Sequence, residues 1–256
     1  MKNKILTFIS TISIFFAVPA AADDICSDRP GLGSAPCTVP THHWQIESDV
    51  VNTTWSNTAG IKNQSTVYFD PTIKLGLDAT TDIELQIAPI VSTKTSGAKI
   101  TGFGDTWIKL KKNLILNDQF GLSVIPMLKV PTADRSIGNG HWEGGIQLPT
   151  NFTIDPNWSI AATSEIDFLK NDQNSGTHIQ LQHSITLQRS IGNGVSLQSG
   201  LGTVVNLDKV TTRQYLFNVA VSKTIKSNLQ LDAGINWGLN RSAPDIAVYT
   251  GISRRF

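Results

Sequence analysis

The sequence predicts an all-β protein: a transmembrane antiparallel up-and-down β-barrel of about twelve strands that follows a cleaved signal peptide. Three observations predict it. From Trp44 onward, apolar and polar residues alternate with a period of two. The segments that alternate are about ten to twelve residues long, which matches the hydrocarbon thickness for strands tilted by about 45°. The connections between them alternate between short and long, as in outer-membrane barrels.

The first residues have the layout of a secretory signal peptide. Lys2 and Lys4 precede an apolar run over residues 5–18, and three alanines at 20–22 form a small-residue cleavage site. The apolar run is short and interrupted, which argues against a membrane-anchor helix. We therefore expect three parts: a signal peptide (1–22), a periplasmic amino-terminal segment (23–41) and an outer-membrane β-barrel (42–256).

Turn residues divide the chain into the expected strands, at residues 43–54, 65–78, 83–95, 104–115, 119–130, 143–154, 158–168, 177–188, 195–205, 213–224, 229–239 and 246–256. The short connections, expected on the periplasmic side, are 79–82, 116–118, 155–157, 190–194 and 226–228. The longer connections, expected outside the cell, are 56–64, 96–103, 131–142, 169–176, 206–212 and 240–245. The alternative is a secreted β-sandwich or lipocalin-like barrel, which would bury its apolar face and would not need strands of such uniform length.

The alternation also predicts which way each side chain points. Lipid offers no hydrogen bonds, so the apolar set should face outward and the charged set should face a watery lumen. Aromatic residues near strand ends fit an interface girdle: Trp44, Phe120, Trp158, Phe168, Tyr215, Trp237 and Phe256. The candidate lumen residues on the barrel wall are Glu47, Asp49, Lys74, Glu84, Lys109, Lys111, Lys129, Glu165, Asp167 and Asp232. Both signs occur, so these residues either bias the passage of permeants or form ion pairs that fill and stiffen the barrel.

Composition narrows the list of partners. The formal net charge is +1, so nothing indicates a nucleic-acid partner. The chain has two cysteines, Cys26 and Cys37, and an exported chain meets an oxidising compartment, so we expect a disulfide between them. Two cysteines do not make a tetrahedral ligand set, so we expect no metal site and no cofactor.

The segment 23–41 is rich in Gly and Pro and cannot form a barrel strand, because its prolines lack the N–H groups that a ladder needs. Two interpretations stay open. It folds back into the periplasmic mouth as a plug, with Arg29 paired to a lumen carboxylate such as Glu47, or it is a loose periplasmic leader.

An enzyme of the barrel-lipase type is the main rival to a channel, and a structural or adhesive barrel is a third alternative. A lipase needs a histidine base beside a serine nucleophile. His183 and Ser184 are adjacent on one expected strand and therefore point to opposite faces, so they cannot act as a pair.

Several short motifs resemble a known family. They are Asp28-Arg29-Pro30, Cys37-Thr38-Val39-Pro40, Trp44-Gln45-Ile46-Glu47, Gly102-Phe103-Gly104-Asp105, Lys129-Val130-Pro131-Thr132, Gly138-Asn139-Gly140 and the terminal Arg255-Phe256. Their order is similar to that in the outer-membrane transporter family also called the putative meta-pathway of phenol degradation family. The chain departs from it at Ala133, where a glycine is expected, and in its paired cysteines. The resemblance implies a Gram-negative outer-membrane channel for passive uptake of small, often aromatic or apolar, molecules.

The chain ends on an alternating strand. Its outward set is expected to be Ile246, Val248, Thr250, Ile252, Arg254 and Phe256, and its inward set Tyr249, Gly251, Ser253 and Arg255. A terminal Phe resembles the signal that barrel-assembly machinery reads. The expected partners are therefore outer-membrane lipid, this machinery and a small-molecule permeant, reached by export through the periplasm. Arg254 is unusual at an outward position.

Overall fold

The computed structural model describes residues 25–58, 60–171, 176–208 and 210–256, so the expected signal peptide (1–22) lies outside the described residues. The strands are β1 (Trp44–Thr58), β2 (Ile61–Tyr68), β3 (Thr72–Asp78), β4 (Thr81–Gln86), β5 (Ile90–Thr95), β6 (Ala98–Gly102), β7 (Thr106–Leu116), β8 (Phe120–Val130), β9 (Glu143–Asp155), β10 (Trp158–Lys170), β11 (Thr177–Gly192), β12 (Val195–Asn206), β13 (Thr212–Lys226), β14 (Leu229–Gly238) and β15 (Ile246–Arg255). Among the described residues, no helix has the length and apolar character of a membrane span.

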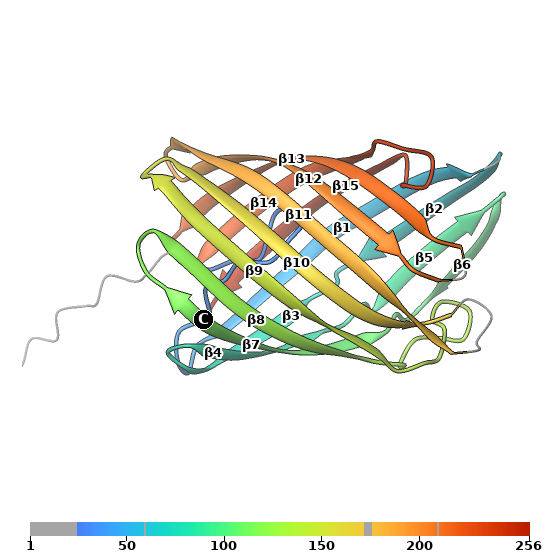
Figure 1. The fold of residues 1–256 in the computed structure, drawn as a ribbon, viewed down its shortest axis with the longest axis horizontal. Coiled ribbons are helices and arrows are strands. Elements are labelled where there is room, and N and C mark those ends of the chain that lie inside the picture. Colours follow the sequence, from blue (N-terminus) through green and yellow to red (C-terminus); the bar gives the residue numbers. More distant parts are fainter. Residues whose placement is uncertain (1–24, 59, 172–175, 209) are drawn as a thin grey trace, which may run out of the picture.

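The strands form one closed antiparallel barrel (Figure 1). Three pairs of segments, β2 with β3, β4 with β5 and β6 with β7, are each one interrupted stave, which leaves twelve staves. The barrel closes where β15 pairs with β1, in a register that sets Arg255 opposite Gln45 and Ile246 opposite Trp55. Closure gives the backbone groups of the first and last staves partners, as a sheet in lipid requires.

The three interruptions lie side by side. They span residues 69–71, 87–89 and 103–105. The same two staves pair on both sides of the interruptions, β2 with β5 on one side and β3 with β4 on the other. The Ile87 N–H donates to the Pro71 carbonyl at 3.0 Å, and the Gly104 N–H donates to the Ala88 carbonyl at 2.8 Å. β1 joins this line through a register shift between Asp49 and Val51. Proline at 71 and 89 has no N–H to donate to the ladder, which is one reason the staves bend here.

Among the described residues, the connections fall where expected except at two places. We expected longer loops over 56–64 and 96–103, which is wrong, because these residues form the β1–β2 and β5–β6 hairpins. Ser96 and Gly97 both have positive φ, 49° and 100°, as a two-residue primed turn needs. These hairpins are rich in polar residues, as loops usually are, and this is why the sequence predicted loops there. Below, the end of the barrel that holds Trp44 and Phe256 is called the terminal end, and the opposite end is called the loop end.

The distribution of polarity is inverted relative to a soluble protein. On β4, Asp82 and Glu84 are 0% and 1% exposed, whereas Ile83 and Leu85 are each 41% exposed. The same alternation recurs around the barrel, so polar side chains fill the interior and apolar side chains cover the outside. A lipocalin-like barrel would show the reverse, so the soluble alternative is wrong. Trp44, Phe168, Tyr215, Trp237 and Phe256 are exposed, as expected for a girdle.

The last strand has the predicted faces. Tyr249, Gly251, Ser253 and Arg255 are buried, and Val248, Thr250 and Arg254 are exposed. The Phe256 N–H donates to the Trp44 carbonyl at 2.8 Å, so the last residue completes the seam between the first and last staves. The Arg254 guanidinium lies 4.8 Å from the centroid of the Phe256 ring, a cation–π contact. The outward arginine therefore has a partner at the barrel rim.

We predict that deletion of Phe256 lowers the yield of folded barrel in the outer membrane, because it removes both the seam hydrogen bond and the terminal aromatic residue. Arg254→Tyr keeps both and should leave the yield unchanged or higher. Heat-modifiable electrophoretic mobility of membrane fractions measures the folded yield. A full yield after deletion of Phe256 would contradict the assembly-signal interpretation.

Candidate functional site

The amino-terminal segment, residues 25–41, runs through the interior of the barrel. Its hydrogen bonds and ion pairs reach β1, β3, β4, β7, β8, β9, β10, β14 and β15. The Pro36 carbonyl accepts hydrogen bonds from Asn113 on β7 and Ser123 on β8. On the far side, the Gln230 amide on β14 donates to the Arg29 carbonyl at 2.9 Å. The segment thus contacts opposite walls.

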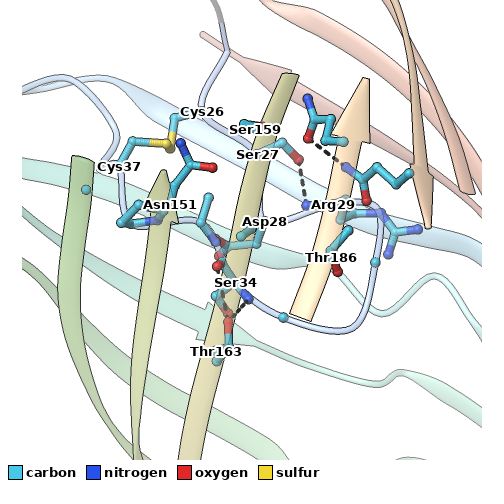
Figure 2. A pocket seen from close by; sticks show the side chains of 18 of the residues that line it. Cys26, Ser27, Asp28, Arg29, Ser34, Cys37, Asn151, Ser159, Thr163 and Thr186 are labelled. Atoms are coloured by element: carbon cyan, nitrogen blue, oxygen red, sulfur yellow. Dashed lines mark hydrogen bonds between the residues drawn. A yellow bond between two sulfur atoms is a disulfide. The ribbon is translucent and has the colours of Figure 1, made fainter. Parts of the chain in front are cut away.

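A disulfide between Cys26 and Cys37 is present, as predicted, with the two Cα atoms 5.9 Å apart. It closes a covalent ring that contains Asp28, Arg29 and Ser34, as Figure 2 shows. The Ser34 N–H donates to the Thr163 hydroxyl at 3.1 Å, which fixes the ring to β10. By the loop-entropy relation, a ring of this size restricts the unfolded segment by roughly 3 kcal/mol or less.

Asp28 is the acidic half of the attachment. Its carboxylate lies 2.6 Å from Lys74 Nζ on β3 and 2.8 Å from Lys111 Nζ on β7. Lys74 also lies 2.6 Å from Glu47 Oε1, and Lys111 lies 3.3 Å from Glu84 Oε1. Burial alone would raise the pKa of Asp28, but Lys111 and Lys74 outweigh it and hold this pKa well below its usual range. Asp28 therefore stays ionised and bridges two lysines on different staves.

Arg29 is the basic half. One of its terminal nitrogens lies 2.5 Å from Asp49 on β1 and 2.8 Å from Asp232 on β14, and its Nε donates to the second oxygen of Asp232 at 3.2 Å. A Cβ at Gly251 would overlap the guanidinium, so glycine is needed there. Burial alone would lower the pKa of Arg29, but Asp232 and Asp49 raise it above its ordinary value.

Arg29 pairs with lumen carboxylates, as the plug interpretation expected, but they are Asp49 and Asp232 and not Glu47, the example named. Glu47 binds Lys74 and accepts the Asp28 N–H at 3.0 Å, while Arg29 reaches Asp49, the next inward residue of the same strand. The alternation along β1 correctly predicted that Glu47 and Asp49 face the lumen, but it could not show which of the two binds Arg29. Asp28 was named only as part of the Asp28-Arg29-Pro30 motif and was not predicted as a site residue.

The candidate lumen residues fall into separate groups. Arg29 lies in the ring, and six of them surround it: Glu47, Asp49, Lys74, Glu84, Lys111 and Asp232. Lys129 lies apart, 2.6 Å from Glu143 and 3.1 Å from Asp105. Glu165 and Asp167 share the amide of Gln182, at 2.9 Å each. Lys109 is half-buried and lines a cavity of about 130 Å³ beside Asp28.

The inner wall is uneven in charge. The staves that contact Asp28 and Arg29 carry carboxylates and lysines. On β11, β12 and β13, by contrast, the inward side chains in the middle of the strands are amides, hydroxyls and small residues, namely Gln182, Ser184, Thr186, Gln188, Gln198, Gly200, Gly202, Asn218 and Ser222. We call this part the neutral wall. A cavity of about 330 Å³ lies between it and the disulfide ring.

The outer face carries a polar pair that sequence reasoning missed. His183 Nδ1 on β11 lies 3.1 Å from the Ser164 hydroxyl oxygen on β10, and both residues are exposed. They are register partners on neighbouring strands, whereas the alternation within β11 alone relates His183 only to its chain neighbour Ser184. A histidine beside a hydroxyl is a combination that can act as base and nucleophile.

Comparisons with known proteins agree with this geometry. The family model described as "Putative MetA-pathway of phenol degradation" matches residues 27–256. An outer-membrane channel from Pseudomonas putida F1 is similar in structure, with a TM-score of 0.72, 14% identity, and coverage of 89% of this chain and 100% of that one. The NanC porin (TM-score 0.55, 5% identity) is covered over 98% of its length by 82% of this chain.

A third similar structure is the translocator domain of the autotransporter NalP from Neisseria meningitidis, with a TM-score of 0.54 and 9% identity over 85% of this chain and 90% of that one. No curated protein sequence matches the chain. At these identities the structures establish a common fold, that of outer-membrane β-barrels.

We predict that Arg29→Gln loosens the segment 25–41 inside the barrel. The substitution leaves Asp49 and Asp232 buried without their cation, which typically costs about 3–5 kcal/mol. Amide hydrogen exchange of residues 25–41 should therefore become faster. Arg189→Gln is the matched control, because Arg189 lies on the outer face, over the Trp158 ring. Equal exchange in the two variants would contradict the role given to Arg29.

Proposed function

Because the chain belongs to the family described as "Putative MetA-pathway of phenol degradation", we propose that it is an outer-membrane channel for passive movement of small molecules, narrowed by residues 25–41. The observation that carries this proposal is the attachment of Asp28 and Arg29 to β1, β3, β7 and β14. A segment tied to several walls of the lumen reduces the open cross-section, as a loose leader would not.

The polarity of the two surfaces supports a place in the outer membrane. Apolar side chains cover the outside and polar side chains fill the inside, as a barrel that encloses water in lipid requires. The proposal includes outer-membrane lipid and the barrel-assembly machinery as partners. It also gives the wall residues Glu47, Asp49, Lys74, Glu84, Lys111 and Asp232 the task of holding the constriction rather than of binding the permeant.

The family resemblance implies small aromatic or apolar permeants. A liposome-swelling series with small aromatics, sugars and amino acids tests the channel itself and this class together. Swelling with at least one solute is expected, and absence of swelling with every solute would reject a constitutive channel.

We predict that deletion of residues 24–40 raises the single-channel conductance. The deletion removes Asp28, Arg29 and the ring that fills the lumen, so ions meet a wider aqueous path. A barrel that still shifts on heating in electrophoresis is the control for folding. Unchanged conductance of a folded deletion variant would contradict the constriction.

The His183–Ser164 pair is the one observation that favours the lipase alternative. A channel needs no nucleophile on its outer face, so we predict that phospholipid hydrolysis in detergent with Ca²⁺ is the same for the wild-type protein and Ser164→Ala. Hydrolysis that disappears in Ser164→Ala would show that the pair is catalytic and would contradict a purely passive role.

A further inference from the structure

Two cavities lie along the same four staves, β10 to β13, one nearer the terminal end and the other nearer the loop end. The cavity of about 330 Å³ is lined by Ser159, Ala161, Thr186, Gln188, Gln198 and Ser222, which belong to the halves of these strands nearer the terminal end. The cavity of about 80 Å³ is lined by Glu165, Gln182, Gly202, Val204 and Leu216, which belong to the halves nearer the loop end. All four strands give the same order, so the cavities follow one line along the barrel.

The two cavities meet at Leu32. Leu32, Thr163 and Ser184 line both of them. Leu32 belongs to the disulfide ring, and its Cδ1 would lie 3.0 Å from a Cβ built at Gly202. A larger residue at 202 would therefore press on Leu32. The leucine side chain fills the narrow point between the two cavities against a wall that glycine leaves open.

Leu32 is attached differently from the rest of the ring. Asp28 and Arg29 are held by ion pairs to β1, β3, β7 and β14, and Ser34 by hydrogen bonds to β9 and β10. Leu32 lies between Gly31, whose φ is 124°, and Gly33, and it faces the neutral wall with an apolar side chain. It can move aside without breaking an ion pair, because its side chain is uncharged and the ion pairs of the ring are made by Asp28 and Arg29.

The wall on this line selects by chemistry. Its side chains are mostly amides and hydroxyls, which donate and accept hydrogen bonds without charge, with the apolar Ala161, Val204 and Leu216 among them. The lining of the smaller cavity includes one carboxylate, Glu165, whose oxygens accept hydrogen bonds from Gln147 at 2.7 Å and Gln182 at 2.9 Å. A solute with hydroxyl or amide groups can exchange its water contacts for such a wall, whereas an ion finds few charged partners there: Asp28 and Arg29, which also line the larger cavity, are already paired, and Glu165 is held by two amides.

We propose that an uncharged solute bearing hydroxyl or amide groups crosses the barrel between the ring and the neutral wall, and that Leu32 is the gate on this path. The inference rests on the proposed channel function and adds the permeant class and the route. It departs from the aromatic or apolar permeants that the family resemblance implies.

Liposome swelling with three solutes of similar size tests the proposal: D-glucose (neutral), gluconate (anion) and glucosamine (cation). Leu32→Ala should raise the glucose rate several-fold and the rates of the two ions far less. Gly202→Val presses a side chain against Leu32 and should lower the glucose rate. Leu201→Ala is the matched control, because Leu201 lies next to Gly202 but is 52% exposed on the outer face; it should behave as the wild-type protein.

The deletion of residues 24–40 distinguishes failure of the Leu32 gate from failure of the proposed constricted channel. If the deletion raises swelling but Leu32→Ala does not, the gate is wrong and the constricted channel stands. If Leu32→Ala raises all three rates equally, the route past Leu32 stands and the uncharged class is wrong. If the folded deletion variant swells no faster than the wild-type protein, the constriction itself fails.

Discussion

The pairing of Asp28 and Arg29 with charges on the barrel wall is the interaction on which the interior depends. A charge taken out of water must be paired, and a lysine or carboxylate left alone there destabilises the fold. Asp28 bridges Lys74 and Lys111, which would otherwise repel each other, and Arg29 does the same for Asp49 and Asp232. Two adjacent residues of opposite sign thus neutralise crowded like charges on neighbouring parts of the wall, Asp28 on β3 and β7 and Arg29 on β1 and β14. The segment and the barrel are electrostatically incomplete without each other.

This constraint explains the uneven lumen. The charged staves are those that form ion pairs or hydrogen bonds with the segment. The strands β11 to β13 do not bind Asp28 or Arg29, and they carry amides and hydroxyls instead. Cavities lie on both sides of the ring, and the one of about 330 Å³ lies between the ring and the neutral wall. The attachment of the amino-terminal segment and the cavity along the neutral wall are therefore both related to the distribution of charge around the barrel.

The sequence predicted the periodic part of the structure well. Period-two alternation identified the inward position of the wall residues it named, from Glu47 to Asp232, and the even number of staves that closes the barrel, but it left out the inward Asp82 and Glu143. It failed where information is not periodic. Polar hairpins at Gly60 and Gly97 resembled loops, the partner of Arg29 was one inward residue away from the expected one, and Asp28 lies on no strand. The His183–Ser164 pair depends on the register between two strands, which one strand's pattern cannot supply.

The disulfide ring has a consequence for the order of assembly. Cys26 and Cys37 are only 11 residues apart, so they can meet by local motion of the chain before any stave exists. The contacts that hold the ring come from strands as distant in sequence as β1 and β14. An oxidised ring can thus form before the rest of the protein, and the barrel then closes around it.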